Sequence, residues 1–402
     1  MPDSSQPITQ QTPQGRRRGH GEAALISVFV LLLLLPTAQM TFKPFRLVPL
    51  NGAEIRPERP AFSWHSFISG EFQKQFDDWF STVLGFRGHL VRSDNQLNFS
   101  LFRELSSAYR SPMLLGKDGF LLEKNYLASF NRLDLLPQDQ LAERAAILKR
   151  LQDALQKRGI AFLLVLSPSK PETHPEYVPE DYVRPERRAL SSNYQTFIEL
   201  LRTEGVNTLD MPAVLRDQKE HVPFPLFAFT GAHWDDVAAC WATQGVVAAL
   251  ESSLKRRLTH LTCEPVIMRD EPREGDLDLA QLCNIWWPGQ LIHPTPYPKT
   301  KALHADGETR PTAVIIGTSF SWALLRFFDY HKVFKARDFY YYYQTNYSFP
   351  SGKIRKIDHA NLDWEKDVFS RDAVIIEINE AVVWQVGFGF IEAALAQLEP
   401  KP

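Results

Sequence analysis

Short runs of apolar residues, each about the length of a β-strand, recur along this chain and constrain its fold more than any other feature. Continuous Val, Ile and Leu runs of this length are typical of strands that are buried on both faces of a sheet. Amphipathic helical segments separate them, and such alternation predicts an α/β sandwich with a mainly parallel sheet between helices. The predicted strands are 160–168, 205–210, 312–319 and 372–379, and the predicted helices are 137–158, 186–203 and 235–256.

The composition fits a globular protein and excludes some classes of function. The chain has 402 residues, 44% of them hydrophobic and 23% charged, which suits one large domain with a smaller appendage. The net charge of −2 gives no electrostatic case for nucleic-acid binding. Cys240, Cys263 and Cys283 are compatible with one disulfide and an odd thiol, and their spacing does not resemble a metal site. We expect no cofactor and no metal.

An uncharged segment near the amino terminus predicts a membrane anchor. Residues 23–40 form an 18-residue run without charge, and with Thr41 and Phe42 the run reaches the length of a membrane-spanning helix. A cleaved signal peptide is the alternative, but its apolar core is shorter and the sequence "PTAQM" is a poor cleavage site. We therefore expect an uncleaved transmembrane helix over 23–42.

The charges that flank this segment indicate its orientation and the domain order. Three arginines (16–18) precede the run, which favours a cytoplasmic tail over 1–22. The remainder then lies in the periplasm of a Gram-negative host, attached to the inner membrane by a single pass. We expect a helical lead-in over 43–110, the α/β domain over 111–395, and a tail over 396–402.

Three polar residues lie where predicted strands or loops end, which is where active groups collect in parallel sheets. Ser319 lies in the turn of "GTSFS" between a strand and a helix, where it is either a nucleophile near a helix N-terminus or a helix cap. His233, in "FTGAHWDD", directly precedes a helix and is either a base or a structural histidine. Lys170, in a proline-rich loop after the first strand, either binds a substrate group or is solvated.

Aromatic residues near these positions suggest carbohydrate binding. The stretch "FYYYYQTNYSF" (339–349) contains Tyr341, and Trp234 adjoins His233. Tyrosine and tryptophan offer a flat apolar ring for a sugar face and a polar atom for a hydroxyl. The alternative is an edge strand with tyrosines paired across it. Trp234, Tyr341 and Lys170 are the candidate substrate-binding residues.

Seven motifs in the same order carry a resemblance to a known family. The chain resembles the alginate O-acetyltransferase family of AlgJ and AlgX proteins, which have an SGNH-hydrolase-like domain. It is more similar to AlgJ, because no stretch after residue 395 would hold a carbohydrate-binding module. The motifs are "GFRGHLV" (85–91), "LLGKDGFLL" (114–122), "RGIAFLLVLSPSKPETHPEYVPE" (158–180), "TGAHW" (230–234), "EGDLDLAQL" (274–282), "VIIGTSFS" (314–321) and "VIIEINE" (374–380).

The resemblance assigns roles to two residues and leaves a third role open. It implies that Ser319 is the nucleophile and His233 the base. The family's acid lies two residues before the histidine, and this chain has Gly231 there. Asp235 and Asp236 open the following helix and are expected to cap it. Asp210, Glu377 and Glu380 follow predicted strands and are the candidate acids.

The implied function is O-acetylation of an exopolysaccharide, alginate-like or cellulose-like, by a membrane-anchored protein. The resemblance implies a multispanning membrane acyltransferase as acetyl donor and other acetylation proteins as partners. Because Gly231 replaces the acid, the alternative is a catalytically weak, polysaccharide-binding assembly protein. An acetyl esterase with the same residues is a further alternative. If the acid is missing, Gly231→Asp should raise activity.

Overall fold

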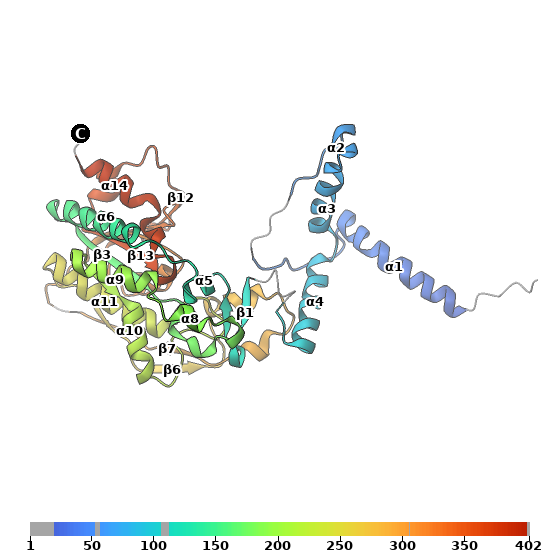
Figure 1. Cartoon of the computed structure of the whole chain (residues 1–402), viewed down its shortest axis with the longest axis horizontal. Helices are drawn as coiled ribbons and strands as arrows, with labels where there is room; N and C mark the ends of the chain where they lie inside the picture. Colours follow the sequence, from blue (N-terminus) through green and yellow to red (C-terminus); the bar gives the residue numbers. More distant parts are fainter. Residues whose placement is uncertain (1–19, 53–56, 106–111, 305, 400–402) are drawn as a thin grey trace, which may run out of the picture. The chain divides into compact units, whose positions relative to one another are not determined.

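The computed structural model describes residues 20–52, 57–105, 112–304 and 306–399. The chain separates into two compact units, Met1–Asp94 and Asn95–Pro402 (Figure 1). Each unit has its own packing. The division falls inside the fourth helix, α4 (Arg87–Phe102), and the sequence-based limit at 110/111 stays a prediction.

The first unit contains the apolar helix α1 (His20–Phe42), the short α2 (Trp64–Ile68), α3 (Glu71–Val83) and the start of α4. Within α1, Gly21–Phe42 is long and apolar enough to cross a membrane, and only 6% of its most apolar window is buried. An apolar helix that exposes most of its surface requires an apolar surrounding. The helix is therefore a candidate membrane span.

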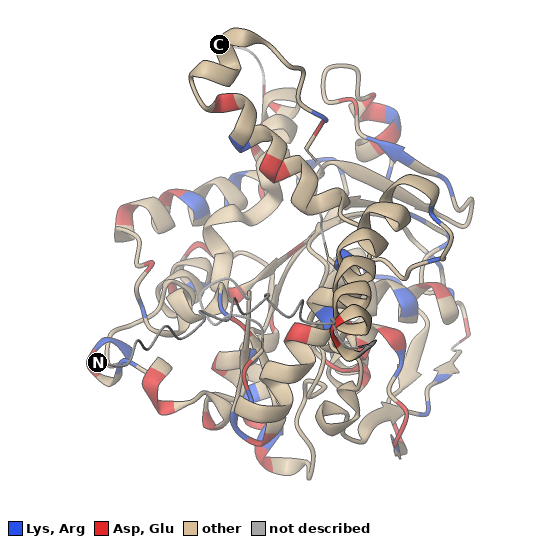
Figure 2. Ribbon diagram, turned by 90° about the vertical axis from the view of Figure 1, so that its right-hand side faces the viewer, with Lys and Arg blue, Asp and Glu red and all other residues tan. Residues whose placement is uncertain are grey.

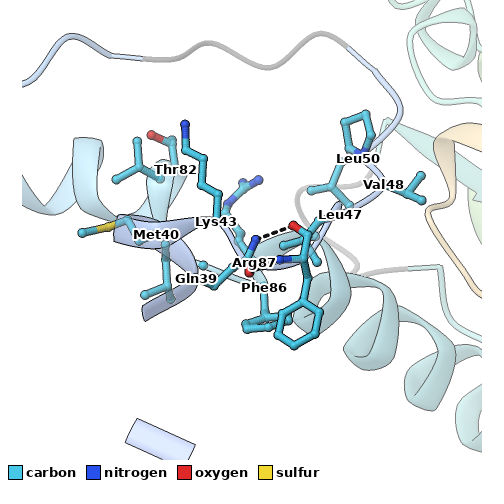
Figure 3. Close-up of a pocket in the computed structure, with 15 residues that line it drawn as sticks. Gln39, Met40, Lys43, Leu47, Val48, Leu50, Thr82, Phe86 and Arg87 are labelled. Atoms are coloured by element: carbon cyan, nitrogen blue, oxygen red, sulfur yellow. Dashed lines mark hydrogen bonds between the residues drawn. The ribbon is translucent and has the colours of Figure 1, made fainter. Parts of the chain in front are cut away.

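The last turn of α1 packs inside the first unit instead of ending in free chain. Gln39 is buried, and its side-chain amide donates to the Phe45 carbonyl at 2.8 Å and accepts from the Phe45 N–H at 3.1 Å. A Cβ added at Gly85 would lie 2.1 Å from the Pro36 carbonyl oxygen, so only glycine permits this approach. Figure 3 shows the adjoining hollow of about 320 Å³, bounded by the end of α1, by 43–50 and by 82–88.

A seven-stranded sheet forms the centre of the second unit, in the order β12-β11-β10-β9-β13-β3-β4. The strands from β10 to β4 are parallel, and β11 and β12 extend one edge in antiparallel fashion. The prediction of a mainly parallel sheet is confirmed. The bounds are β3 Ala161–Ser167, β4 Thr208–Asp210, β9 Thr312–Gly317, β10 Ala336–Tyr341, β11 Thr345–Phe349, β12 Ile354–Lys356 and β13 Ala373–Asn379.

Both faces of this sheet are covered, as continuous apolar strands require. In β3, Leu163 and Val165 belong to one apolar cluster, whereas Phe162 and Leu164 belong to the other. The helices α6 and α14 pack on one side of β3 and β13, and α11 packs on the opposite side (Figure 1). The main helices are α6 Gln138–Lys157, α9 Asn193–Glu204, α10 Met211–Gln218, α11 Asp236–Leu254, α13 Ser321–Tyr330 and α14 Phe390–Leu398.

Smaller elements complete the unit at the edges of the sheet. The motif 114–122 lies in a hairpin of two antiparallel strands, β1 (Met113–Leu115) and β2 (Leu121–Glu123). Cys240 and Cys263 form a disulfide, and Cys283 is a buried free thiol. The others are α5 Tyr126–Phe130, α7 Lys170–Thr173, α8 Pro185–Arg188, β5 His260–Thr262, β6 Val266–Arg269, α12 Asp278–Leu282, β7 Thr295–Pro298 and β8 Lys301–Leu303.

Two local differences from the predicted elements have clear causes. The predicted helix 186–203 is divided, because Ser192 and Gln195 form a reciprocal capping box that starts α9 at Asn193. Helix α14 continues to Leu398, three residues into the predicted tail. The segment Glu380–Leu398 also has the length and composition of a membrane span, but 44% of its window is buried and its apolar residues join the core.

Charged residues of both signs are interspersed along the helices in Figure 2. This distribution agrees with the net charge of −2. A basic stripe of the kind that tracks a nucleic-acid backbone is not visible on the face drawn.

Candidate active site

Ser319 lies in the turn between β9 and α13, at the carboxyl edge of the sheet. Its Oγ is 2.8 Å from Nε2 of His233, although 86 residues separate the two. The Phe320 N–H donates to Thr318 Oγ1 at 3.2 Å, which tightens the turn. The Ser319 hydroxyl is therefore hydrogen-bonded to a group that can accept its proton.

Asp278, the first residue of α12, contacts the other side of the same imidazole. Its Oδ2 lies 3.0 Å from His233 Nδ1, and its Oδ1 accepts from the Ala232 N–H at 2.8 Å and from the Leu279 N–H at 2.7 Å. The His233 and Asp278 side chains are 29% and 31% exposed, so the pair is partly shielded from water. The result is a Ser–His–Asp arrangement in which the carboxylate can hold the ring tautomer and stabilise an imidazolium.

Gly231 leaves little space for the acid that the family pattern puts there. A Cβ at this position would meet the Ala228 Cβ and the Asp276 carbonyl oxygen, both at 3.3 Å. The loop that carries Asp276 and Asp278 packs against 228–231, and the Thr230 hydroxyl donates to the Asp276 carbonyl at 2.7 Å. The loop thus takes the place of a side chain at 231 and brings Asp278 to His233.

Glu377, on β13, is not the acid for His233, so that candidate assignment was wrong. Its side chain is fully buried and accepts four hydrogen bonds, from the Ser167 hydroxyl (2.6 Å), the Thr318 N–H (2.7 Å), the Thr318 hydroxyl (2.8 Å) and the Ser321 hydroxyl (2.9 Å). Burial raises its pKa, and the four donors oppose that effect. From its position on β13, Glu377 therefore holds the turn around Ser319 against the sheet.

The two other candidate acids are also engaged elsewhere. Asp210 accepts from the Tyr194 hydroxyl at 2.7 Å and from the Ala213 N–H at 3.2 Å, where it caps α10. Glu380 accepts from the Ser169 N–H at 2.8 Å and pairs with Arg216 at 3.1 Å. Asp210 thus caps the helix that follows it, and Glu380 joins the loop after β3 to Arg216, so both serve structure.

Lys170 does not face substrate, contrary to expectation. It is 1% exposed, and its ammonium donates to the carbonyls of Ala228 (2.7 Å), Phe229 (3.1 Å) and Gly231 (2.7 Å). The same nitrogen lies 4.0 Å from the centre of the Phe120 ring. Burial lowers the pKa of Lys170 well below its usual range, against the attraction of Asp278 and Glu123. Lys170 positions the loop that carries His233.

Trp234 and Tyr341 were also predicted to bind substrate, and their surroundings argue otherwise. Trp234 is 2% exposed, and its indole N–H donates to the Phe320 carbonyl at 3.1 Å, so it ties the histidine segment to the nucleophile turn. Phe320 in turn lies edge-on to the His233 ring at 4.9 Å. Tyr341 is half-buried against Trp322 and Tyr347, which is the paired-strand alternative.

Sequence reasoning missed Glu123, at the end of the hairpin before the sheet, and Tyr126, at the start of α5. The Leu121 N–H donates to the Phe229 carbonyl at 2.8 Å, and this contact holds the start of β2 against the histidine loop. Burial raises the pKa of Glu123, while the charge of His233 opposes the shift. Burial and the charge of Glu123 raise the pKa of Tyr126 well above its usual range. Glu123 therefore lies within electrostatic range of His233 and Asp278, and Tyr126 within range of Asp278.

The backbone of the turn provides a donor for negative charge. Among the described residues, the Ser319 N–H has no hydrogen-bond partner, and Ser319 lies just before the N-terminus of the ten-residue α13. Such a position favours an oxyanion. Within the described residues, no cluster of three or more His, Cys, Asp or Glu side chains could hold a metal ion.

An α/β sandwich with Ser, His and Asp joined at the carboxyl edge of its sheet defines an SGNH-hydrolase-like protein. A family model described as "SGNH hydrolase-like domain, acetyltransferase AlgX" matches residues 113–336, which include Ser319, His233 and Asp278. The chain belongs to this family.

Individual relatives are more distant. A protein of Pseudomonas aeruginosa described as a probable alginate O-acetylase, AlgJ, is 27% identical over 191 residues, which cover 45% of this chain and 43% of the relative. The AlgJ of Pseudomonas syringae pv. tomato is 28% identical over 154 residues, covering 38% and 36%. The matched part thus spans less than half of either relative. The solved O-acetyltransferase domain of Pseudomonas putida AlgJ has 19% identity and a TM-score of 0.42, covering 68% of this chain and 93% of that one.

Proposed function

We propose that this protein is a membrane-anchored, extracytoplasmic O-acetyltransferase that acetylates hydroxyl groups of a polysaccharide. The observation that supports the proposal most is the hydrogen-bonded series Ser319–His233–Asp278, with distances of 2.8 and 3.0 Å. Membership of the acetyltransferase family and the similarity to proteins described as alginate O-acetylases support the choice of acyl group.

The geometry is suited to a two-step transfer. His233 accepts the proton of Ser319 as its Oγ attacks the carbonyl carbon of an acetyl donor, and the Ser319 N–H stabilises the oxyanion. The donor's leaving group departs with that proton, and an acetyl ester remains on Ser319. A sugar hydroxyl then gives its proton to His233 and attacks the ester, which releases the O-acetylated sugar and restores the Ser319 hydroxyl.

The position of Asp278 removes the main reason for the assembly-protein alternative. That alternative depended on Gly231, where the family acid is absent. A carboxylate on His233 Nδ1 can supply the same orientation and charge from another loop. An acetyl esterase would use the same residues with water as the acceptor, so the two activities are separated by experiment.

Two features support an extracytoplasmic location and an uncleaved anchor. The disulfide between Cys240 and Cys263 is of a kind that persists in oxidising compartments. Phe45 would lose both of its hydrogen bonds with the buried Gln39 if the chain were cut after the end of α1. Protease added to spheroplasts should therefore remove the domain after Lys43. Protection of that domain in intact spheroplasts would contradict the orientation.

The partners follow from the same proposal. The acceptor is an exopolysaccharide chain, and a membrane-bound acyltransferase supplies the acetyl group to the extracytoplasmic side, together with other acetylation proteins. The relatives are described as alginate O-acetylases, which supports a polysaccharide as the class of acceptor.

The test is to trap and transfer the acetyl group. The full chain in lipid nanodiscs is mixed with p-nitrophenyl acetate, and mass spectrometry locates the acetyl group, which we expect on Ser319. Ser319→Ala should abolish labelling and turnover, whereas the control Ser253→Ala, at an exposed serine on α11, should change neither. An oligosaccharide is then added as acceptor. If the oligosaccharide becomes acetylated, the protein is a transferase, and if only acetate is released, it is an esterase. A folded wild type that never carries acetyl on Ser319 would refute the catalytic proposal.

A further inference from the structure

A second hollow lies at the same edge of the sheet as Ser319 and has no role in the transfer steps described above. Its volume is about 650 Å³. Two loops, 342–344 and 384–389, form most of its wall, and α6 and α14 contribute one charged residue each. The residues that line it are Arg144, Tyr342, Tyr343, Gln344, His359, Trp384, Gln385, Val386, Phe388, Gly389 and Glu392. All of these except Arg144 follow residue 336, where the family match ends.

Tyr342 connects this hollow to the catalytic edge. Its N–H donates to the carbonyl of Gly317 at 2.9 Å, and Gly317 is the last residue of β9, two positions before Ser319. Tyr342 is therefore hydrogen-bonded to the end of the strand that leads to Ser319. A chain of sugars that presents one hydroxyl to Ser319 would therefore extend across Tyr342 into the hollow.

Aromatic residues at the rim are held in an unusual backbone conformation. Tyr342, Tyr343 and Phe388 have φ angles of +47°, +54° and +51°, a region that bulky L-residues rarely adopt. Phe388 lies between Gly387 and Gly389, which also have positive φ, and its ring is edge-on to Tyr342 at 5.0 Å. Residues of this kind persist where the surroundings enforce them, and they cluster at ligand sites.

The wall offers the mixture of surfaces that sugars require. Trp384 is 44% exposed, and within the described part of the chain neither a ring nor a hydrogen-bond acceptor contacts its indole. The side chains of Gln344 and Gln385 likewise make no hydrogen bond to described residues. A sugar's C–H face can stack on the exposed indole, while its hydroxyls exchange hydrogen bonds with the two amides.

The charges around the hollow favour a neutral ligand. Arg144 is ion-paired with Glu392, so the positive and negative charges of the lining cancel. Toward the nucleophile, the Asp278 carboxylate contacts His233, and the Glu123 carboxyl lies within electrostatic range of both. The ammonium of Lys170 is buried against three carbonyls. A uronate carboxylate would approach the carboxyl groups near His233 at one end of the path. At the other end it would meet Arg144, whose charge Glu392 already neutralises, so the site disfavours a uronate.

We propose that the hollow around Tyr342, Trp384 and Phe388 is an acceptor subsite for a neutral glycan, a chain of uncharged hexoses rather than uronates. The inference depends on the proposed acetyl transfer for its biological meaning. Its binding prediction can be tested without catalysis.

The experiment compares hexasaccharides that differ in charge but share their linkage. Calorimetry measures binding of β-1,4-linked glucose, mannose and mannuronate hexamers to the full chain in neutral nanodiscs, with Ser319→Ala to prevent turnover. We expect a neutral hexamer to bind at least tenfold more tightly than the mannuronate hexamer. Trp384→Ala should weaken neutral binding at least tenfold. The matched control Trp287→Ala removes a 73% exposed tryptophan outside the hollow and should leave the binding of the neutral hexamer unchanged.

The other results would contradict the proposal. If the mannuronate hexamer binds as tightly as the neutral hexamers or more tightly, the neutral class of ligand is refuted. Unchanged binding in Trp384→Ala refutes the location, and failure of both neutral hexamers to bind refutes the subsite altogether. Acetyl labelling of Ser319 is measured separately, so a protein that binds the neutral hexamer but never becomes acetylated would refute the proposed function and leave the glycan site in place.

Discussion

Oδ2 of Asp278 lies 3.0 Å from Nδ1 of His233, and 45 residues of chain separate the two. The other carboxylate oxygen accepts from the N–H groups of Ala232 and Leu279, so Asp278 is fixed both to the histidine segment and to its own helix. The acid of this site therefore comes from a loop that packs against Gly231 and not from the residue at 231.

Replacing this acid should remove most of the activity and little of the fold. In Asp278→Asn, the remaining oxygen can still accept from Ala232 and Leu279, but the amide presents a donor to Nδ1 and favours the wrong tautomer. We expect kcat to fall by up to about 10⁴-fold, or about 5 kcal/mol of barrier, with Tm nearly unchanged. Hydrolysis of p-nitrophenyl acetate measures the effect, and the exposed Asp270→Asn is the control. Wild-type turnover in Asp278→Asn would exclude Asp278 as the acid.

Gly231→Asp should lower activity, which reverses the expectation from sequence. The new Cβ would lie 3.3 Å from the Asp276 carbonyl oxygen, and a further carboxylate would be added beside Asp276 and Asp278. Gly275→Asp adds the same group where a Cβ meets nothing within 4 Å, and serves as the control. Tm and kcat should both decrease in Gly231→Asp, and both should be unchanged in Gly275→Asp. An increase in kcat would mean that Asp278 does not supply the acid.

Lys170→Met should loosen the histidine loop. The substitution removes the donor that joins the carbonyls of Ala228, Phe229 and Gly231. The Phe229 carbonyl keeps the Leu121 N–H and the Ala228 carbonyl keeps the Gly231 N–H, so the Gly231 carbonyl loses its donor, at a cost of about 1–3 kcal/mol for a buried group left unsatisfied. We expect a lower Tm together with a lower kcat and little change in KM, because the lysine contacts no substrate. Lys117→Met, at an exposed surface pair, is the control. If Lys170→Met and Lys117→Met show equally small decreases in Tm and kcat, Lys170 does not position the loop.

Glu176 should contribute to stability only above its native pKa. Although partial burial disfavours its charge, hydrogen bonds from His174 and Lys219 lower the pKa of Glu176 from 4.5 to about 2. A depressed native pKa stabilises the fold above the ordinary pKa, and this contribution disappears as pH falls from 4.5 toward 2.

The Tm difference between wild type and Glu176→Gln should consequently be largest near neutral pH and shrink on acidification through that window. Glu180→Gln, at a carboxylate that is 90% exposed, should show a much smaller difference at every pH. A Tm difference that does not vary with pH would show that the ion pair is not the cause.

Much of the scaffold could be predicted because its signals are local. The apolar run 312–319 predicted the strand β9, and the turn after it carries Ser319 as expected. His233 precedes α11, which Asp235 caps through its bond to the Ala238 N–H, in agreement with the predicted capping role. Burial on both faces of a strand and capping of a helix each depend on neighbours within a few residues, so they can be read from a single sequence.

The acid could not be predicted in this way, although one signal was present. The motif "EGDLDLAQL" is part of the family resemblance and contains Asp278, the first residue of α12, but no local pattern indicates its contact with His233. The ends of the strands suggested Asp210, Glu377 and Glu380 instead. Each of these carboxylates accepts hydrogen bonds from N–H or hydroxyl groups near its own strand.

The sequence by itself determined the layers of this protein, the apolar helix at its start, and the turn and loop that carry Ser319 and His233. Only the tertiary structure decided that Asp278 completes the series, that Lys170 and Trp234 point inward, and that Tyr342 and Trp384 line one hollow. The reason is physical. Secondary structure follows from periodicities of a few residues, whereas a site depends on contacts between segments 45 and 86 residues apart, which the packing of whole loops creates.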